Sequence, residues 1–222
     1  MTRAAVAVWY ADVTTERDRS GSPRDPAGDD GAPDEPAAGG LRRRQWLGGG
    51  ASLLLAGGCV GTRGGPTVAS VPGPSLDPAA ELRRIAFGSC LHQDHPQPIL
   101  DVIVRQQPGL MLMLGDNVYA DAEDEATLRE AYATLGRREE WARLRAAVPL
   151  LATWDDHDYG RNDAGAEYPL RDASQAIMLD FFGEPADSPR RQRPGVYHAV
   201  TLGPVGRRVQ VILLDTRYFR GA

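Results

Sequence analysis

The feature that most constrains this chain is a series of short apolar segments, each followed at once by polar residues of unusual chemistry. Four such segments are RIAFGS (84–89), LMLML (110–114), VPLLATW (148–154) and RVQVILLD (208–215). Apolar runs of this length, bounded by turn-forming residues, are typical of buried strands. A fifth segment, GVYHAVTL (195–202), alternates apolar and polar residues, which predicts an antiparallel neighbour.

Helical patterns separate these strands. The segment EDEATLREAYATL (123–135) begins with acidic residues, which stabilise the amino-terminal end of a helix dipole. Because strands alternate with helices, the sequence predicts an α/β layered fold with parallel strands at its centre. The expected helices span residues 98–107, 123–135, 138–147 and 173–182.

Residues with ligating or catalytic side chains follow each of the four apolar strands. Open α/β sheets build their sites at the carboxyl ends of strands, where loops from neighbouring strands meet. We therefore expect these residues to face one another across one edge of the sheet. They are Cys90, Asp116, the run Asp155 to His157, and the pair Asp215 and Arg217.

The segment 155–163 concentrates negative charge in a way that a solvated surface does not require. It holds four aspartates, a histidine and an asparagine within nine positions. Carboxylates and the phenol of Tyr119 suit hard cations, whereas the thiolate of Cys90 selects a transition metal. The sequence therefore predicts a cation site that mixes hard and soft ligands.

A site of this kind has a definite chemical use. Two cations that share a carboxylate polarise a phosphoryl oxygen and acidify a bound water. His157 beside them could act as a general acid. The planar fork of Arg217 suits contact with two phosphate oxygens. The residues therefore favour the hydrolysis of phosphate esters.

Four motifs, FGSC, GDNVYAD, TWDDHDYGRND and LLDTRYFR, resemble the PhoD-type alkaline phosphatase/phosphodiesterase family of the metallophosphoesterase superfamily. The resemblance runs from Arg84 to Arg220 and rests on the order and spacing of all four motifs. It implies a metallophosphoesterase-like αββα sandwich, export by the twin-arginine route, and a site that holds ferric iron with calcium (Fe³⁺ and Ca²⁺). The implied activity is the hydrolysis of phosphate mono- or diesters.

The same resemblance implies a role for individual residues. Cys90 would be the thiolate ligand of iron, Asp116 the bridging carboxylate and Tyr119 the phenolate ligand. Asp156 would take the metal-ligand position that asparagine occupies in the superfamily's G-N-H-E/D motif. His157 would be the catalytic histidine, and Arg217 would hold phosphate. The residues implied in contacts with the substrate or behind the ligands are Asn117, Asp155 and Asn162.

The sequence departs from the family pattern at its end. Family members continue beyond the L-D-x-R motif and supply further ligands in a late G-D-x-H segment. This chain ends at YFRGA, and none of its four histidines lies in such a motif. We therefore expect residues 82–222 to form the amino-terminal part of a metallophosphoesterase domain, with an incomplete site and sheet.

The residues before this domain divide into three parts. Residues 1–40 are rich in Pro, Gly, Asp and Ser and are expected to be disordered. Residues 41–59, with paired arginines before a short apolar run, predict a twin-arginine-type signal segment, and residues 60–81 a Gly/Pro linker. The protein is thus expected to meet the twin-arginine export machinery and to be periplasmic, cell-surface or secreted, with a possible lipid anchor at Cys59.

Composition excludes one class of partner and leaves two other functions open. The 25 basic residues are all arginine, evenly spread in a chain of net charge −5, which argues against nucleic-acid binding. One alternative is a non-catalytic exported cation-binding lipoprotein. Another is a zinc hydrolase that uses Cys90, His92 and His95. The arginines in SPRRQRPG (188–195) are interpreted as a solvated loop able to attract an anionic substrate.

Overall fold

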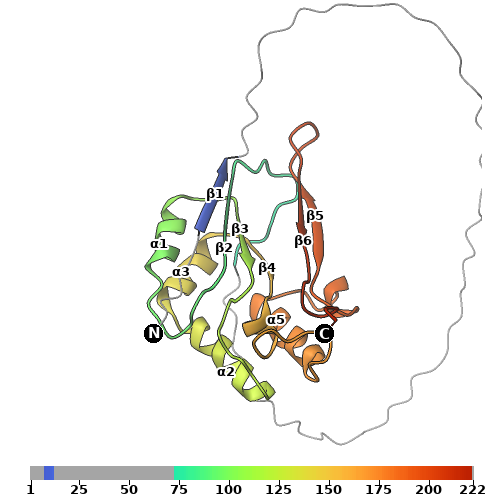
Figure 1. Ribbon diagram of the computed structural model, residues 1–222. Helices are drawn as coiled ribbons and strands as arrows, with labels where there is room; N and C mark the ends of the chain where they lie inside the picture. The colour runs from blue at the N-terminus through green and yellow to red at the C-terminus, as the bar shows by residue number, and fades with distance from the viewer. Residues whose placement is uncertain (1–7, 13–72, 222) are drawn as a thin grey trace, which may run out of the picture. The chain divides into compact units, whose positions relative to one another are not determined.

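The computed structural model describes residues 8–12 and 73–221 (Figure 1). One strand lies near the amino terminus, and the other elements follow one another along the chain from Arg84 onward. In chain order they are β1 (Val8–Asp12), β2 (Arg84–Gly88), α1 (Pro98–Arg105), β3 (Leu110–Leu114), α2 (Glu125–Gly136), α3 (Glu139–Ala147), β4 (Leu150–Thr153), α4 (Asp156–Tyr159), α5 (Arg171–Phe182), η1 (Pro189–Arg191), β5 (His198–Leu202) and β6 (Val209–Leu213).

The central sheet has the order β1-β2-β3-β4. Strands β2, β3 and β4 are parallel, with Ile85 opposite Leu110 and Met111 opposite Leu150. The helices that connect them, α1 and then α2 and α3, lie where the sequence pattern predicted helices. The prediction of an α/β fold with parallel strands at its centre is confirmed.

Strand β1 corrects the prediction that residues 1–40 are disordered throughout. Val8–Asp12 pairs antiparallel with β2, so that Val8 lies opposite Gly88 and Asp12 opposite Arg84. The segment VWYAD contains β-branched and aromatic residues, which favour strands. Composition averaged over forty residues hid this short segment, and its pairing partner lies more than seventy residues away. The signal segment 41–59 with Cys59, and the linker up to residue 72, lie outside the described residues.

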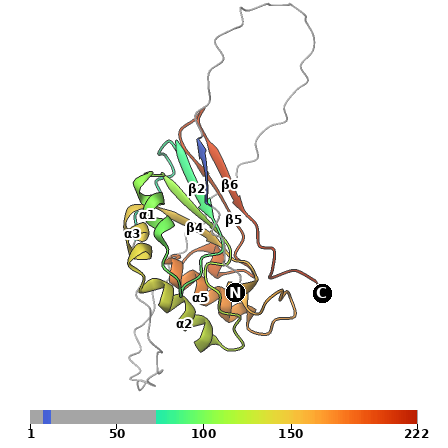
Figure 2. The ribbon, with the colours of Figure 1, turned by 60° about the vertical axis from the view of Figure 1, so that its left-hand side comes forward.

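The two faces of the central sheet pack against two different hydrophobic clusters. Because side chains alternate along a strand, successive residues contribute to opposite faces. Figures 1 and 2 show the sheet between helices α1 and α3 and the hairpin β5-β6. The residues packed with the helices are Ala86, Met111, Met113 and Ala152. Those packed with the hairpin are Ile85, Leu110, Leu112 and Leu151.

The hairpin formed by β5 and β6 is a second sheet, not a continuation of the first. The prediction that all four strand ends share one sheet is therefore wrong for β6. The antiparallel neighbour predicted for residues 195–202 is present, and it is β6. The ends of the two sheets nevertheless meet, because Thr153 Oγ1 donates a hydrogen bond to the carbonyl of Leu214 (2.8 Å). Trp154 Nε1 likewise donates to Asp215 Oδ1 (2.9 Å).

The described layers follow the order helix, sheet, sheet, which corresponds to three layers of the expected αββα sandwich. Within the described part of the chain, nothing covers the outer face of the hairpin. Ile212 and Leu214 are 60% and 66% exposed there. None of the described helices has both the length and the apolar character needed to cross a bilayer.

The sequence suggested that the loop before β5 is a solvated, anion-attracting segment, but one of its three arginines is buried. Arg190 is only 2% exposed. Its guanidinium donates to the carbonyls of Ala152 (2.8 Å) and Val196 (3.1 Å) and pairs with Glu184 at 3.0 Å. Arg190 therefore fastens the end of β4 to the segment that leads into β5.

Replacing Arg190 tests this connection. Arg190→Met should lower the free energy of unfolding by about 3–5 kcal/mol, because it removes the ion-pair partner of Glu184 and the donor that bonds to two backbone carbonyls. Denaturant unfolding measures the change. Arg137→Met, which removes an exposed pair with Glu130, is the control and should change stability far less. Equal effects from the two variants would contradict the structural role of Arg190.

Candidate metal centre

The loops that follow β2 and β3 are joined by backbone hydrogen bonds. The amide of Cys90 donates to the carbonyl of Gly115 (3.2 Å), and the amide of Leu91 donates to that of Asp116 (2.8 Å). Gly115 has a φ of 113°, and a Cβ added there would lie 2.7 Å from the Cβ of Asp155. Glycine thus allows the loop after β3 to approach the loop after β4 closely.

Three non-glycine residues in the loops after β2 and β3 adopt left-handed backbone conformations. The φ angles are 63° for Cys90, 49° for Asp116 and 44° for Asp121. Such conformations are strained for residues with a Cβ and are found most often where function requires a fixed orientation. Two of the three residues carry the sequence-predicted ligands at the ends of β2 and β3.

The one-turn helix α4 holds the acidic cluster in place. Its reciprocal capping box joins the Asp155 side chain to the backbone of Asp158 and the Asp158 side chain to the backbone of Asp155. Asp158 is fully buried and also accepts bonds from the backbone amide (3.0 Å) and the side-chain amide of Asn117. Burial raises the pKa of Asp158 to about 7, against the opposing effect of these bonds. Asp158 therefore links the loops after β3 and β4.

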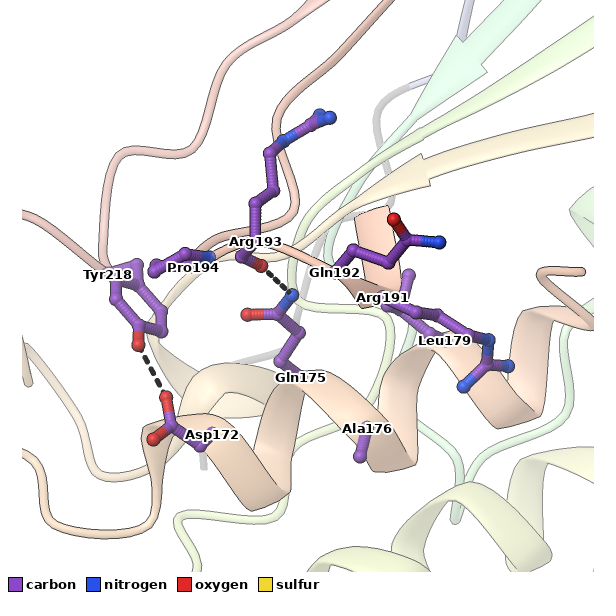
Figure 3. Close-up of a pocket in the computed structure, with 9 residues that line it drawn as sticks. All are labelled: Asp172, Gln175, Ala176, Leu179, Arg191, Gln192, Arg193, Pro194 and Tyr218. Carbon is purple, nitrogen blue, oxygen red and sulfur yellow. Dashed lines mark hydrogen bonds between the residues drawn. The ribbon is translucent and has the colours of Figure 1, made fainter. Parts of the chain in front are cut away.

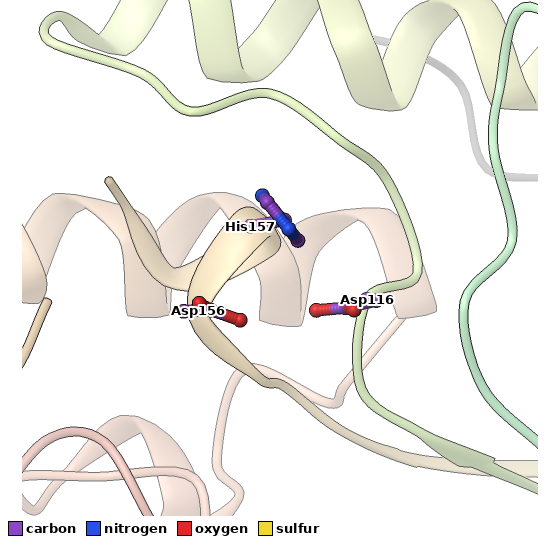
Figure 4. Close-up of side chains that lie close together, drawn as sticks. All are labelled: Asp116, Asp156 and His157. Atoms are coloured by element: carbon purple, nitrogen blue, oxygen red, sulfur yellow. The ribbon is translucent and has the colours of Figure 1, made fainter. Parts of the chain in front are cut away.

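Asp116, Asp156 and His157 form the candidate metal centre (Figure 4). One potential ligand atom from each lies within 4.8 Å of those of the other two. Asp116 and Asp156 are each 8% exposed. The buried Oδ1 of Asp116 has no hydrogen-bond partner among the described residues. A buried carboxylate oxygen without a donor fits a bound cation.

The other oxygen of Asp116 contacts Cys90 and Tyr119, two further ligands that the sequence predicted. Cys90 Sγ lies 3.6 Å from Asp116 Oδ2, and Tyr119 donates its hydroxyl to the same oxygen at 3.3 Å. Burial, followed by the hydrogen bond with Cys90, raises the pKa of Tyr119. Thiol, phenol and carboxylate thus converge on one point, which suits a transition metal or ferric ion. The donor set fits the implied metal.

The two carboxylates of the centre differ in their tendency to ionise. Burial and the negative charges of Asp155 and Asp156 raise the pKa of Asp116. Burial also opposes ionisation of Asp156, but a bond from the Asp163 amide (2.7 Å) and the charge of Arg217 lower its pKa. The ionised form of Asp156 is therefore stabilised by groups of the protein itself, whereas an added positive charge would stabilise the ionised form of Asp116.

His157 is oriented by the carboxylate of Asp121, which precedes the predicted helix 123–135. Its Nδ1 lies 2.7 Å from Asp121 Oδ1. Burial would lower the pKa of His157, but the bond and charge of Asp121, together with Asp116 and Asp156, raise it above 6.5. Because Nδ1 is engaged, Nε2 is the nitrogen left to act toward a metal or a substrate.

Arg217 reaches the centre from the second sheet. Its Nε lies 2.5 Å from Asp155 Oδ1, and its terminal nitrogens lie 3.5 Å from Asp156 and 3.8 Å from Asp163. These carboxylates raise the pKa of the guanidinium despite its partial burial. Arg217 thus supplies positive charge to the acidic cluster.

The structure unites most of the sequence-predicted site residues and separates a few. Asn117 is buried behind the centre, where its side chain donates to the carbonyl of Thr153 (2.9 Å). Asn162 is exposed and bonds to Asp163. Cys90, His92 and His95 do not form a ligand group among the described residues, so the zinc-site alternative gains no support.

Sequence reasoning missed three aspartates around this centre. Asp121 orients His157, Asp158 links two loops, and Asp163 donates its amide to Asp156. Asp158 and Asp163 belong to the acidic segment 155–163, but the sequence did not indicate their individual roles. Asp121 had no signal of its own, because its contact depends on the path of the loop after β3.

A separate hollow on α5 shares no residue with the centre (Figure 3). It has a volume of about 320 Å³. Two pairs of its lining residues are hydrogen-bonded: Gln175 donates to the carbonyl of Arg193 (2.8 Å), and Tyr218 donates to Asp172. These contacts fasten the η1 loop and the segment after β6 to α5.

Comparison with known proteins bears on the fold. No protein-family model matches the sequence, and no curated protein matches it. The solved structure of PhoD does match, with a TM-score of 0.54 and 20% sequence identity. The fold is PhoD-like. The match covers 68% of this chain and 34% of the PhoD chain, so this chain spans about one third of the length of that structure.

Replacing Asp158 tests the link between the loops. Asp158→Asn should lower the free energy of unfolding by about 3 kcal/mol, because an amide NH₂ would face backbone donors that now have a carboxylate acceptor. Denaturant unfolding measures this. Asp187→Asn, on an exposed loop, is the control and should leave stability unchanged. A neutral Asp158→Asn would contradict the role of this carboxylate.

The pKa of His157 provides a second test. In the metal-free chain, Asp121→Asn should lower this pKa, because burial lowers it and the hydrogen bond and charge of Asp121 no longer raise it. NMR titration of the imidazole measures the shift. The wild-type pair should stabilise the fold fully below pH 6.5 and lose this contribution as the pH rises through the raised pKa of His157. Glu123→Gln, near Arg161, is the control. An unchanged pKa in Asp121→Asn would contradict the pairing.

Proposed function

We propose that this chain is a metal-dependent phosphoric ester hydrolase of the PhoD type. The observation that carries the proposal is the convergence of Asp116, Asp156 and His157, with one oxygen of Asp116 buried and unpartnered. These residues follow the ends of β3 and β4, and the PhoD-like fold of the chain supports the proposal. The substrate would be a phosphate mono- or diester.

The residues divide between two cations. Cys90, Asp116 and Tyr119 would hold Fe³⁺, because thiolate, carboxylate and phenolate together suit a trivalent transition metal. Asp116 and Asp156 would hold Ca²⁺ through oxygen atoms. When bound, the two ions would supply Lewis acidity toward the phosphoryl group and an activated water.

The remaining residues would position the substrate and move a proton. His157, held through Nδ1 by Asp121, would protonate the departing alkoxide from Nε2. Its raised pKa keeps the imidazole protonated to higher pH than that of an ordinary histidine. Arg217 would bind phosphate oxygens, and Asp155 would hold the guanidinium in position.

We also propose that the protein is exported. The pattern of residues 41–59 supports passage through the twin-arginine machinery, and Cys59 would be the site of a lipid anchor. The mature protein would then be periplasmic, cell-surface or secreted. These proposals rest on the sequence pattern, because the segment lies outside the described residues.

Elemental analysis of the full chain tests the metal assignment. Purified chain should contain iron and calcium, and Cys90→Ser should lose the iron, because a hydroxyl replaces the only described thiolate. Tyr119→Phe should lose visible absorption, since ferric phenolate absorbs visible light. Cys59→Ser provides a matched control, because this cysteine lies in the proposed signal segment, and it should retain iron.

Other outcomes distinguish the alternatives. Zinc in place of iron, retained in Cys90→Ser, would contradict the PhoD-type assignment. Metal that binds as proposed without hydrolysis of p-nitrophenyl phosphate or bis-p-nitrophenyl phosphate would instead favour a cation-binding protein. Both results would leave the PhoD-like fold in place, since the fold rests on the arrangement of its elements.

A further inference from the structure

A series of aromatic rings leads away from the candidate metal centre. The ring of His157 lies 4.4 Å from that of Tyr119, measured between centroids. On from Tyr119, the ring of His92 is stacked at 5.1 Å with an interplanar angle of 11°. His95 follows, 4.5 Å from His92. The series thus begins at a member of the centre and ends at an exposed imidazole.

The outer rings border a small cavity. Its volume is about 220 Å³, and its lining includes Cys90, His92, His95, Pro96, Pro98 and Ile99. A cavity of about 150 Å³ is large enough for benzene, so this one accommodates a single ring. None of its lining residues is an aspartate, a glutamate or an arginine. Its walls therefore suit a flat, uncharged group.

The loop that carries these histidines is held firmly. The side-chain amide of Gln93 both donates to and accepts from the backbone of Tyr119, at 3.0 Å and 2.9 Å. Gln97 donates to the carbonyl of His92 at 2.7 Å. Both glutamines are buried. Because the loop is fixed to the residues of the centre, the cavity is pre-formed and not created by a ligand.

We propose that this cavity binds an aromatic ring carried by the ester group of the substrate, so that aryl phosphates are the preferred substrate class. The inference rests on the proposed function, because the centre must hold the phosphate. Cys90 connects the two regions: it lines the cavity, and its sulfur lies 3.6 Å from Asp116 Oδ2. A phosphate at the centre would therefore have its substituent beside His92 and His95, whose rings offer stacking surfaces.

The test compares two phosphonates that differ in the presence of a ring. Phenylphosphonate and methylphosphonate are titrated by calorimetry into the full chain loaded with ferric iron and calcium. Phenylphosphonate should bind about 3- to 10-fold more tightly, the range expected for one aromatic contact. In His95→Ala this preference should disappear, while the affinity for methylphosphonate stays the same. His95→Phe, which restores a ring, should restore the preference.

Matched controls and contrary results make the test decisive. His198→Ala removes an imidazole from β5, outside this cavity, and should keep the wild-type preference. Equal binding of both phosphonates to the wild-type chain, or an unchanged preference in His95→Ala, would overturn the aromatic site alone. Failure of both phosphonates to bind the loaded chain would overturn the proposed phosphoesterase function and the aromatic site with it.

Discussion

The buried carboxylate of Asp158 is the interaction on which the geometry of the site depends. It accepts bonds from the loop after β3, through Asn117, and from the start of its own helix, through the Asp155 amide at 2.7 Å. Burying a carboxylate is unfavourable unless donors surround it, so the fold gains nothing from Asp158 unless both loops are in place. Asp116 and Asp156, one on each loop, are consequently fixed relative to each other before any ligand arrives.

This fixed spacing brings two negatively charged carboxylates close together, so a positive charge between them would be stabilising. Asp116 and Asp156 lie close enough to share one cation, and like charges at such a separation disfavour each other's ionisation. Arg217 compensates the negative charge of Asp156, which it contacts, but none of its described contacts is with Asp116. Burial, together with the charges of Asp155 and Asp156, raises the pKa of Asp116, and one of its oxygens has no hydrogen-bond partner among the described residues. A bound cation would reverse both.

Sequence reasoning succeeded where local pattern decides the structure and failed where distant segments meet. The ends of β2, β3 and β4 could be located from apolar runs, so the convergence of Cys90, Asp116 and Asp156 was predictable. The pairing of β1 with β2, the separate hairpin and the burial of Arg190 each depend on partners far away in the chain. No local pattern specifies such partners. The contact of Asp121 with His157 likewise depends on a left-handed turn, which propensity does not foretell.

Under the proposed function, Arg217 would both neutralise the acidic cluster and hold a phosphate. Its short contact is the one from Nε to Asp155, at 2.5 Å, whereas its terminal nitrogens lie 3.5 Å and 3.8 Å from their carboxylates. The Nε contact fixes the position of the guanidinium, and the longer contacts yield more readily because attraction falls with distance. The two terminal nitrogens are the pair that can contact a phosphate side by side. A phosphate would therefore take the place of the weaker contacts and leave the anchoring one intact.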